Sequence, residues 1–540
     1  MRVVNAEQMR QIEERAIDHY GIPSLLLMEN AAWAVVEEIR RHLHKAGEVS
    51  VNGRKAVILV GKGNNGGDGL AVARHLVFQG MDVTVFLFAG LTELKGDAAL
   101  NLRLFQGTTG KCFVIEGEKQ RRLTRLALAQ ADIVVDALYG IGMRGALPSL
   151  IEEYVNEVNC SSSGWVVSID IPSGVEANTG KVYRTAIRAQ TTVTFGLPKW
   201  GLFLGEGPDY SGRVVVDPIS IPESYFTDEG ISTFVLTDED VHNMLPVRKL
   251  SGHKGTHGKG ILVAGSKGMS GAAVLAGRGA LRSGIGLLQI VTPHGIAKEV
   301  DASVTEATVW SAPGDDCLNG EAWPVILKQS EKAQALAVGP GLAQNSQFVP
   351  VLEEILGNIG CPVVLDADAL NLVAIEPGLL SLRNGLGPLI LTPHPGEMAR
   401  LCGCSVEDIE LNRLDIAVAK AVEWEAVVVL KGSVTIIASP DGRAFFNPTG
   451  NPGLGTGGTG DVLTGSILAW LAQGVTPLEA ACLGAYLHGK SADDLATEYG
   501  WSGFTALEVA DRLPKVRREV EMKLPERKRG GENGVATSLG

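Results

Sequence analysis

Short apolar runs alternate with segments of helical period through most of the chain. The first four runs lack the strict alternation of a half-exposed strand: KAVILVG (55–61), DVTVFLF (82–88), ADIVVDAL (131–138) and WVVSIDI (165–171). Such runs are typical of parallel strands that are covered on both faces. Helices are predicted between them, for example over 68–79, and before them over 6–20 (ended by Gly21) and after Pro23. The pattern predicts a Rossmann-like three-layer α/β/α domain over residues 1–225.

A second series of apolar runs begins near residue 259. Its members are GILVAG (260–265), LLQIVT (287–292), ALAVGPG (335–341), PVVLDAD (362–368), PLILTPH (388–394) and AVVVLKG (426–432). They predict a second α/β/α domain over residues 235–520. The segment 221–233 has no clear period and is the predicted linker between the domains. Residues 523–540 are polar and rich in glycine, so we expect a disordered tail there.

Composition narrows the classes of function. A chain of 540 residues, 45% hydrophobic and 20% charged, is expected to fold around more than one core. Its net charge of −13 disfavours a nucleic-acid partner, because an acidic surface repels phosphate backbones. The seven scattered cysteines form no metal-binding spacing, and neither a signal peptide nor a membrane span is visible. We expect a soluble cytoplasmic protein without a membrane partner, and a homo-oligomer of a size that the sequence does not give.

The strongest chemical signal is TGNPGLGTGGTGD (449–461). This segment contains six glycines and is followed by a predicted apolar helix. Glycine lets backbone amides approach an anion closely, and a helix N-terminus adds further donors. Asp461 would repel a phosphate, so it is better placed to take a proton from a hydroxyl that attacks a phosphoryl group. The alternative is that Asp461 is a simple helix N-cap.

Six further segments accompany this motif: HKGTHGKGILVAGS (253–266), GAAVLAGRGALRSGIGLL (271–288), VGPGL (338–342), DADALN (366–371), TPHPGEMARL (392–401) and LKGSVTI (430–436). Together they resemble the nicotinamide-nucleotide hydrate dehydratases of the ribokinase-like superfamily, over roughly residues 235–515. The resemblance implies that ADP phosphorylates the hydroxyl of hydrated NADH or NADPH. Phosphate then leaves as the dihydronicotinamide ring reforms, and AMP is released.

The resemblance also implies roles for individual residues. Asp461 would be the base. The anion hole and the nucleotide-phosphate site would comprise Gly457, Gly458, Gly460, Lys431, Gly432, Ser433, Val434 and Thr435. The hydrated substrate would contact Ala272, Gly341, His394 and Asp461. From the residues alone, His394 could equally be a packing histidine and Lys431 a solvated one. Magnesium is expected for phosphoryl transfer, and the choice between ADP and ATP stays open.

A second glycine-rich segment, GKGNNGGDG (61–69), follows the first predicted strand. Its amides could meet a pyrophosphate, although a tight turn is the alternative. Asp136 lies at the end of another strand before a glycine-rich loop, and Asp170 and Ser173 lie at the end of a third. Strand-end loops share one edge of a parallel sheet, so these groups can meet.

NNGGDG, VVDALYGIG and SIDIPSG together resemble the epimerases that interconvert the two C6 epimers of hydrated NAD(P)H, over residues 1 to about 225. The implied substrate contacts are Asn64, Asn65, Gly66, Gly67, Asp68, Gly140, Ile141, Gly142, Met143, Arg144, Gly145, Ala146 and Asp170. Asn65, Asp136 and Ser173 would supply oxygens to a potassium ion. Asp170 would be the acid–base residue, with a purely structural strand-end carboxylate as the alternative.

The whole chain is thus interpreted as a bifunctional NAD(P)H-hydrate repair enzyme, since a dehydratase that accepts one epimer needs a partner for the other. Two other hypotheses stay open. One is a vitamin or sugar kinase with a regulatory N-terminal half. The other makes the N-terminal half a non-catalytic binding module.

Overall fold

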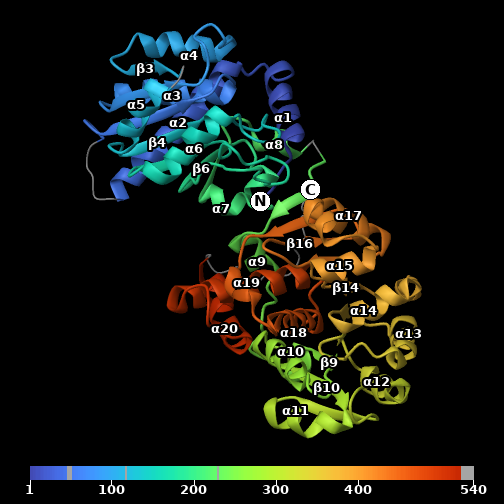
Figure 1. The fold of residues 1–540 in the computed structure, drawn as a ribbon. Coiled ribbons are helices and arrows are strands. Elements are labelled where there is room, and N and C mark those ends of the chain that lie inside the picture. Colours follow the sequence, from blue (N-terminus) through green and yellow to red (C-terminus); the bar gives the residue numbers. More distant parts are fainter. Residues whose placement is uncertain (46–50, 116–117, 228–229, 524–540) are drawn as a thin grey trace. The chain divides into compact units, whose positions relative to one another are not determined.

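The computed structural model describes residues 1–45, 51–115, 118–227 and 230–523. The chain divides into two compact units, one comprising Arg2–Ile231 and the other beginning at Ser232 (Figure 1). The division falls within the predicted linker, where a short helix, α8 (Glu223–Thr227), is present instead of irregular chain. The predicted disordered tail lies, from residue 524 on, outside the described residues. Across the described chain, no helix combines the length and apolarity needed to cross a bilayer.

The first unit is built on a seven-stranded parallel sheet of order β3-β2-β1-β4-β5-β6-β7. Its strands are β1 (Lys55–Val60), β2 (Asp82–Leu87), β3 (Lys111–Val114), β4 (Ile133–Ala137), β5 (Trp165–Ile169), β6 (Thr191–Phe195) and β7 (Arg213–Asp217). Its other helices are α1 (Ala6–Asp18), α2 (Ser24–Lys45), α3 (Asn64–Phe78), α4 (Gly96–Gln106), α5 (Glu118–Leu128), α6 (Ser149–Ser161) and α7 (Gly207–Ser211).

Both faces of this sheet are buried. Ile58 of β1 packs in a core with residues of α1 to α4, whereas its neighbour Leu59 packs on the other face with residues of α6. The predicted three-layer α/β/α architecture is therefore confirmed for this unit. The order of strands reverses between β1 and β4, which is where ligands bind in open α/β sheets.

The second unit contains a ten-stranded sheet of order β11-β10-β9-β12-β13-β14-β15-β16-β17-β8, parallel from β11 to β15. Its strands are β8 (Thr233–Val235), β9 (Lys259–Val263), β10 (Leu287–Pro293), β11 (Thr308–Ala312), β12 (Ala335–Val338), β13 (Val363–Leu365), β14 (Leu389–Leu391), β15 (Val427–Leu430), β16 (Thr435–Ala438) and β17 (Ala444–Asn447).

Helices cover both faces of this sheet as well. Ala337 of β12 packs with residues of α10, α18, α19 and α20, and Leu336 with residues of α12, α13 and α14. The helices of the unit are α9 (Asp238–Met244), α10 (Ser270–Arg282), α11 (Ala297–Ser303), α12 (Trp323–Ser330), α13 (Val349–Asn358), α14 (Asp368–Ile375), α15 (Pro395–Cys402), α16 (Val406–Leu411), α17 (Arg413–Glu423), α18 (Thr459–Ala472), α19 (Pro477–Tyr499) and α20 (Ala506–Lys523).

The predicted start of one helix is wrong. The helix expected over 68–79 begins at Asn64, so that Asn64 to Asp68 form its first turn rather than a loop before it. The glycines serve close packing there. A Cβ on Gly66 would lie 2.0 Å from the carbonyl oxygen of Gly61, at the end of β1. The glycine content suggested a loop because it does not distinguish a flexible segment from a helical turn pressed against a strand.

Candidate active sites

Asp461 lies in the first turn of α18, which begins two residues earlier at Thr459. Gly458, in the left-handed conformation with φ of 92°, is the N-cap residue, so the interpretation of Asp461 as an N-cap is wrong. A cavity of about 460 Å³ lies against this turn. Its lining brings together five of the predicted residues, namely Ala272, Gly341, Gly457, Gly458 and Asp461.

The environment of Asp461 suits a proton acceptor. No described residue donates a hydrogen bond to its carboxylate in the structure. Burial, reinforced by the negative charge of Asp366 and opposed by Lys431, raises the pKa of Asp461 to about 7. A general base is most effective when its pKa lies near the working pH. Asp461 therefore lines a cavity that a substrate could enter, and its pKa suits proton removal.

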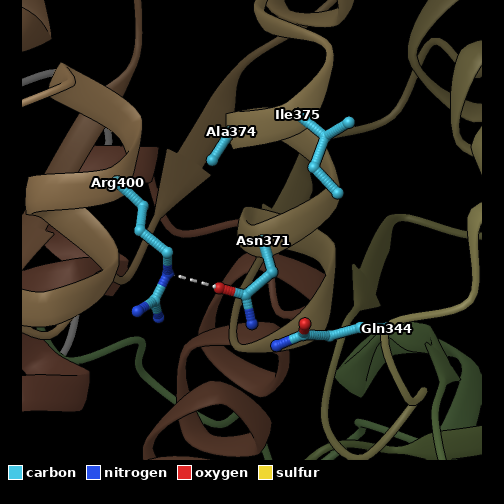
Figure 2. Close-up of a pocket in the computed structure, with 5 residues that line it drawn as sticks. All are labelled: Gln344, Asn371, Ala374, Ile375 and Arg400. Atoms are coloured by element: carbon cyan, nitrogen blue, oxygen red, sulfur yellow. Dashed lines mark hydrogen bonds between the residues drawn. The ribbon is translucent and has the colours of Figure 1, made fainter.

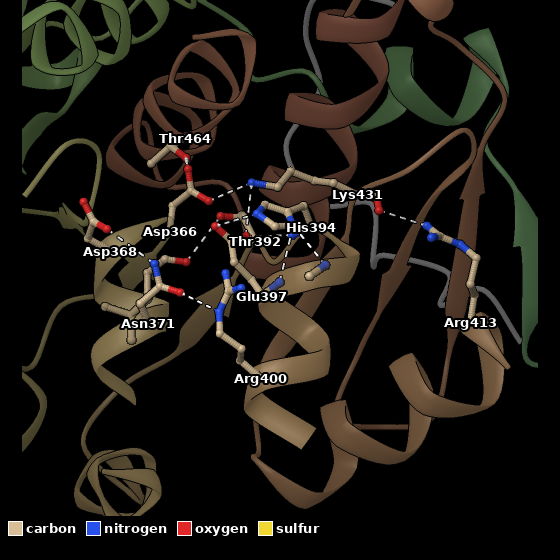
Figure 3. Close-up of polar contacts among 12 residues, drawn as sticks. Asp366, Asp368, Asn371, Thr392, His394, Glu397, Arg400, Arg413, Lys431 and Thr464 are labelled. Atoms are coloured by element: carbon tan, nitrogen blue, oxygen red, sulfur yellow. Dashed lines mark hydrogen bonds and ion pairs between the residues drawn. The ribbon is translucent and has the colours of Figure 1, made fainter. Parts of the chain in front are cut away.

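Asp366, at the end of β13, joins α18 to Lys431. Its carboxylate accepts a hydrogen bond of 2.8 Å from Lys431 Nζ and one of 2.6 Å from Thr464 Oγ1, one turn after Asp461 (Figure 3). Burial alone would raise the pKa of Asp366, but Lys431 and Thr464 lower it below its usual value. Conversely, burial would lower the pKa of Lys431, but Asp366 and Glu397 raise it. The pair is thus charged.

Lys431 does not line the 460 Å³ cavity, but it faces the glycine-rich turn. Its Nζ lies 3.6 Å from the point that a Cβ on Gly460 would occupy. The predicted loop 432–435 follows directly. Arg413 of α17 holds this loop, because its guanidinium donates to the carbonyl oxygens of Leu430 (3.1 Å), Lys431 (3.0 Å) and Val434 (3.0 Å).

His394 is the N-cap residue of α15 and not a packing histidine. Its Nδ1 accepts hydrogen bonds from the backbone amides of Gly396 and Glu397, and the carboxylate of Glu397 accepts a hydrogen bond from the amide of His394. Because Nδ1 is an acceptor, a neutral ring carries its proton on Nε2, where it can be donated. Burial and the charge of Lys431 lower the pKa of His394, which favours this neutral form.

In the first unit, β4 and β5 bring Asp136 and Ser173 together. The fully buried carboxylate of Asp136 accepts hydrogen bonds from Ser173 Oγ (2.5 Å), the Ser173 amide (2.8 Å) and Ser168 Oγ (2.8 Å). Burial raises the pKa of Asp136, although these hydrogen bonds oppose the rise. Asn65 lies beside Gly140, and its buried amide nitrogen has no hydrogen-bond partner among the described residues.

Asp170, directly after β5, adopts a φ of 68°, which L-residues rarely adopt. Such strain concentrates at functional sites. Its Oδ1 accepts hydrogen bonds from Lys199 Nζ (2.5 Å) and Thr194 Oγ1 (3.1 Å). The Lys199 side chain is 1% exposed, so this is a buried ion pair.

Two further acidic residues, Glu13 and Asp68, are influenced by the charge of Asp170. Glu13 and Asp68 line a small cavity of about 120 Å³ together with Asn64. Burial raises the pKa of Glu13 to about 7, and burial with the charge of Asp170 raises the pKa of Asp68 well above its usual value. The predicted loop Gly140–Ala146 does not line this cavity, and its Gly140 lies beside Asn65.

Sequence reasoning missed three residues of these clusters: Asp366, Lys199 and Glu13. A signal existed for Asp366, because it ends a predicted strand just as Asp136 and Asp170 do. Lys199 follows a strand rich in threonine that the apolar pattern did not reveal, and Glu13 comes from the first helix of the chain. Within the described residues, no three His, Cys, Asp or Glu side chains are grouped as metal ligands.

The fold and the two clusters define a class of protein: a two-site α/β enzyme whose second site combines an acid of raised pKa with a glycine-rich turn and a buried lysine, groups that suit phosphoryl transfer. Family models match in the same order. "YjeF-related protein N-terminus" matches residues 24–201, and "NAD(P)H-hydrate dehydratase" matches residues 261–515.

Relatives extend over the whole chain. A protein of Moorella thermoacetica named bifunctional NAD(P)H-hydrate repair enzyme Nnr is 42% identical, with 100% of each chain covered. Its namesake from Thermofilum pendens is 36% identical, with 96% of each covered. The ADP/ATP-dependent NAD(P)H-hydrate dehydratase of Bacillus subtilis, crystallised with ATP and Mg²⁺, is 38% identical and covers 53% of this chain and 99% of its own, with a TM-score of 0.47. The chain belongs to the family of bifunctional NAD(P)H-hydrate repair enzymes, and the resemblance inferred from its motifs is confirmed.

Proposed function

We propose that the protein restores hydrated NADH and NADPH through two activities. The first domain, residues 1–225, interconverts the R and S epimers at C6 of the hydrated ring. The second, residues 235–520, dehydrates the S epimer and converts ADP to AMP and phosphate. The positions of the two family models, 24–201 and 261–515, support this assignment. The environment of Asp461 carries the proposal, because an acid with a pKa of about 7 faces a cavity beside a glycine-rich turn.

The dehydration proceeds in two steps. Asp461 takes the proton of the C6 hydroxyl while the hydroxyl oxygen bonds to the terminal phosphorus of ADP, and the bond from that phosphorus to the bridging oxygen breaks to give AMP. The carbon–oxygen bond to the new phosphate then breaks, pushed by the lone pair of the ring nitrogen, and a proton leaves C5. Hydroxide is a poor leaving group and phosphate a good one, so phosphorylation makes the elimination possible.

The amides of Gly457, Gly458 and Gly460 would hold the transferred phosphoryl group, since they lie immediately before and within the first turn of α18, at its N-terminus. Lys431 and Gly432 to Thr435 would hold the remaining nucleotide phosphate. Ala272, Gly341 and His394 would contact the hydrated substrate. Magnesium, when bound, would neutralise charge on the phosphates. Mg²⁺ often uses one or two carboxylates together with substrate phosphates, and Asp368, half-buried and on the cavity wall, suits such a site.

In the first domain, Asp170 would be the acid–base residue at C6, with Lys199 as its buried counter-charge. Asn65, Asp136 and Ser173 would hold potassium through oxygen atoms. These residues fit a hard cation, because Asp136 is buried and has no ion-pair partner among the described residues, and the Asn65 amide can rotate to offer its oxygen. Cytoplasmic location and homo-oligomeric assembly stay predictions, to be checked by cell fractionation and by light scattering.

One assay tests the proposal. A mixture of R and S hydrated NADH is incubated with the protein and either ADP or ATP, and we expect the absorbance of the dihydronicotinamide ring to return with an equal amount of AMP from ADP. Preference for ATP, with ADP as product, would change the donor but keep the reaction. Transfer of phosphate to a vitamin alcohol without any return of absorbance would contradict the proposal and favour the kinase hypothesis.

A further inference from the structure

A second cavity lies next to the site of Asp461. It has a volume of about 430 Å³, within the range of small-molecule sites, and is lined by Gln344, Asn371, Ala374, Ile375 and Arg400 (Figure 2). Arg400 is the charged member of this lining, and the amides of Gln344 and Asn371 add polar groups beside an apolar patch. The chemistry of the wall therefore suits an anionic group attached to a larger organic molecule.

Two wall segments continue from the first cavity into the second. Gly341 lines the first cavity, and Gln344, three residues later in the same loop, lines the second. Asp368 and Asn371 are related in the same way by one turn of α14, and Asn371 Nδ2 donates a hydrogen bond of 3.3 Å to Asp368 Oδ1. Residues three apart on a helix share a face. The two cavities are therefore neighbours along one surface.

Arg400 comes from α15, whose N-cap residue is His394, and lies about 9 Å further along the helix at 1.5 Å per residue. Its Nε donates a hydrogen bond of 2.9 Å to Asn371 Oδ1, which orients the guanidinium (Figures 2 and 3). Its two terminal NH₂ groups form no ion pair or hydrogen bond within the described residues. An arginine held by its Nε with a free fork can bind a phosphate through two donors.

We propose that this cavity binds the phosphate-bearing adenosine half of the hydrated dinucleotide, with Arg400 donating to a phosphate. The proposal rests on the proposed function, because it divides the substrate between two cavities: the hydrated ring beside Asp461, and the pyrophosphate or the 2′-phosphate beside Arg400. A dinucleotide is an extended ligand and needs such a second site. The glycine-rich turn and Lys431 would still bind the phosphates of the nucleotide donor, as in the proposed function.

The test combines a substitution with a shortened substrate. In Arg400→Met, the KM for hydrated NADPH should rise about ten-fold, because a charge-assisted hydrogen bond to phosphate is lost. Arg400→Lys keeps the charge without the fork and should give a smaller rise. The hydrate of dihydronicotinamide riboside has no phosphate, so its KM should be the same in Arg400→Met and the unchanged protein. A rise confined to hydrated NADPH would place the 2′-phosphate at Arg400, and a rise with both dinucleotides would place the pyrophosphate there.

The matched control is Arg443→Met, which removes an exposed arginine that pairs with Asp441 in the turn before β17. This variant should leave all KM values unchanged. Equal effects of Arg400→Met on the dinucleotide and the riboside, or a rise in the KM for ADP instead, would overturn the proposal. Calorimetric binding of hydrated NADH and of the riboside gives the same comparison without turnover. If the unchanged protein bound both but converted neither, the proposed function would fail while the binding data still decided the role of Arg400.

Discussion

The proposed mechanism assigns the chemistry of each unit to a single carboxylate, and burial raises the pKa of the one in the second unit, Asp461. In the second unit, Asp366 is kept ionised by Lys431, and its charge helps to keep the pKa of Asp461 high. Two neighbouring carboxyl groups whose environments push their pKa values apart are a common arrangement in acid–base enzymes. In the first unit, Asp170 has a similar effect on Asp68 and Glu13. In both units, the carboxylate whose charge raises the pKa of its neighbours lies at the carboxyl end of a parallel strand.

The pH dependence of dehydration tests the role of Asp461. A base works only when it is deprotonated, so kcat/KM should rise with pH through about 7, the pKa of Asp461. Because the charge of Asp366 raises this pKa, Asp366→Asn should move the rise to lower pH. Asp461→Asn should lower kcat about 100-fold or more at every pH. The measurement is a pH profile of each variant, with the epimerase rate as the internal control.

An unshifted pH profile in Asp366→Asn would show that Asp366 does not act on the base. An Asp461→Asn variant with nearly full activity would remove the catalytic assignment altogether.

At the scale of elements, α10 and α18 approach closely through small residues. A Cβ on Gly465 of α18 would lie 1.8 Å from the carbonyl oxygen of Ala276, and a Cβ on Gly279 of α10 would lie 2.3 Å from that of Val462. Backbone atoms cannot move aside as a flexible side chain can. The contact therefore fixes α18, with Asp461 in its first turn, against α10, which carries Ala272 at its start.

Gly465→Ala should force these two helices apart. We expect a loss of about 1–3 kcal/mol in the free energy of unfolding of this unit, because an extra methyl group overpacks a filled core. The rate of dehydration should fall with it, whereas epimerisation should be unchanged. The control is Gly357→Ala, since Gly357 is also helical but a Cβ there meets nothing within 4 Å. Thermal unfolding and both rates are measured; equal behaviour of the two variants would show that the close contact is unimportant.

The sequence predicted the buried strands well and the pairing of their polar ends poorly. Continuous apolar runs identify β1, β4 and β9 because both faces of the sheet are covered. β6, with the sequence TTVTF, was not predicted because its threonines are polar. They are buried because their hydroxyl groups form hydrogen bonds with residues distant in the sequence; Thr194, for example, donates to Asp170. Asp461 could be nominated from its local motif. Its setting could not, because the contacts of Asp366 with Lys431 and Thr464 join residues 65 and 98 positions apart.

At the scale of the whole molecule, each unit has its own sheet, its own buried cores and its own cluster of strand-end acids. The core around β1 draws on residues from Val4 to Ile231, and that around β12 on residues from Leu236 to Val520. The substrate of one activity is the product of the other, and it is a small diffusible molecule. Two complete sites in one chain therefore need no shared residue to act in sequence.

This independence is tested by mixing two full-length variants, each of which lacks one of the two activities. With equal amounts of R and S hydrate, Asp170→Ala should convert only the S epimer rapidly, and Asp461→Asn should interconvert the epimers without forming NADH. A mixture of the two variants should convert both epimers at nearly the rate of the unchanged protein, because the S hydrate leaves one chain and enters another. The return of dihydronicotinamide absorbance measures conversion, and chiral chromatography measures each epimer. If either substitution damaged both activities equally, the two clusters would not be separate sites.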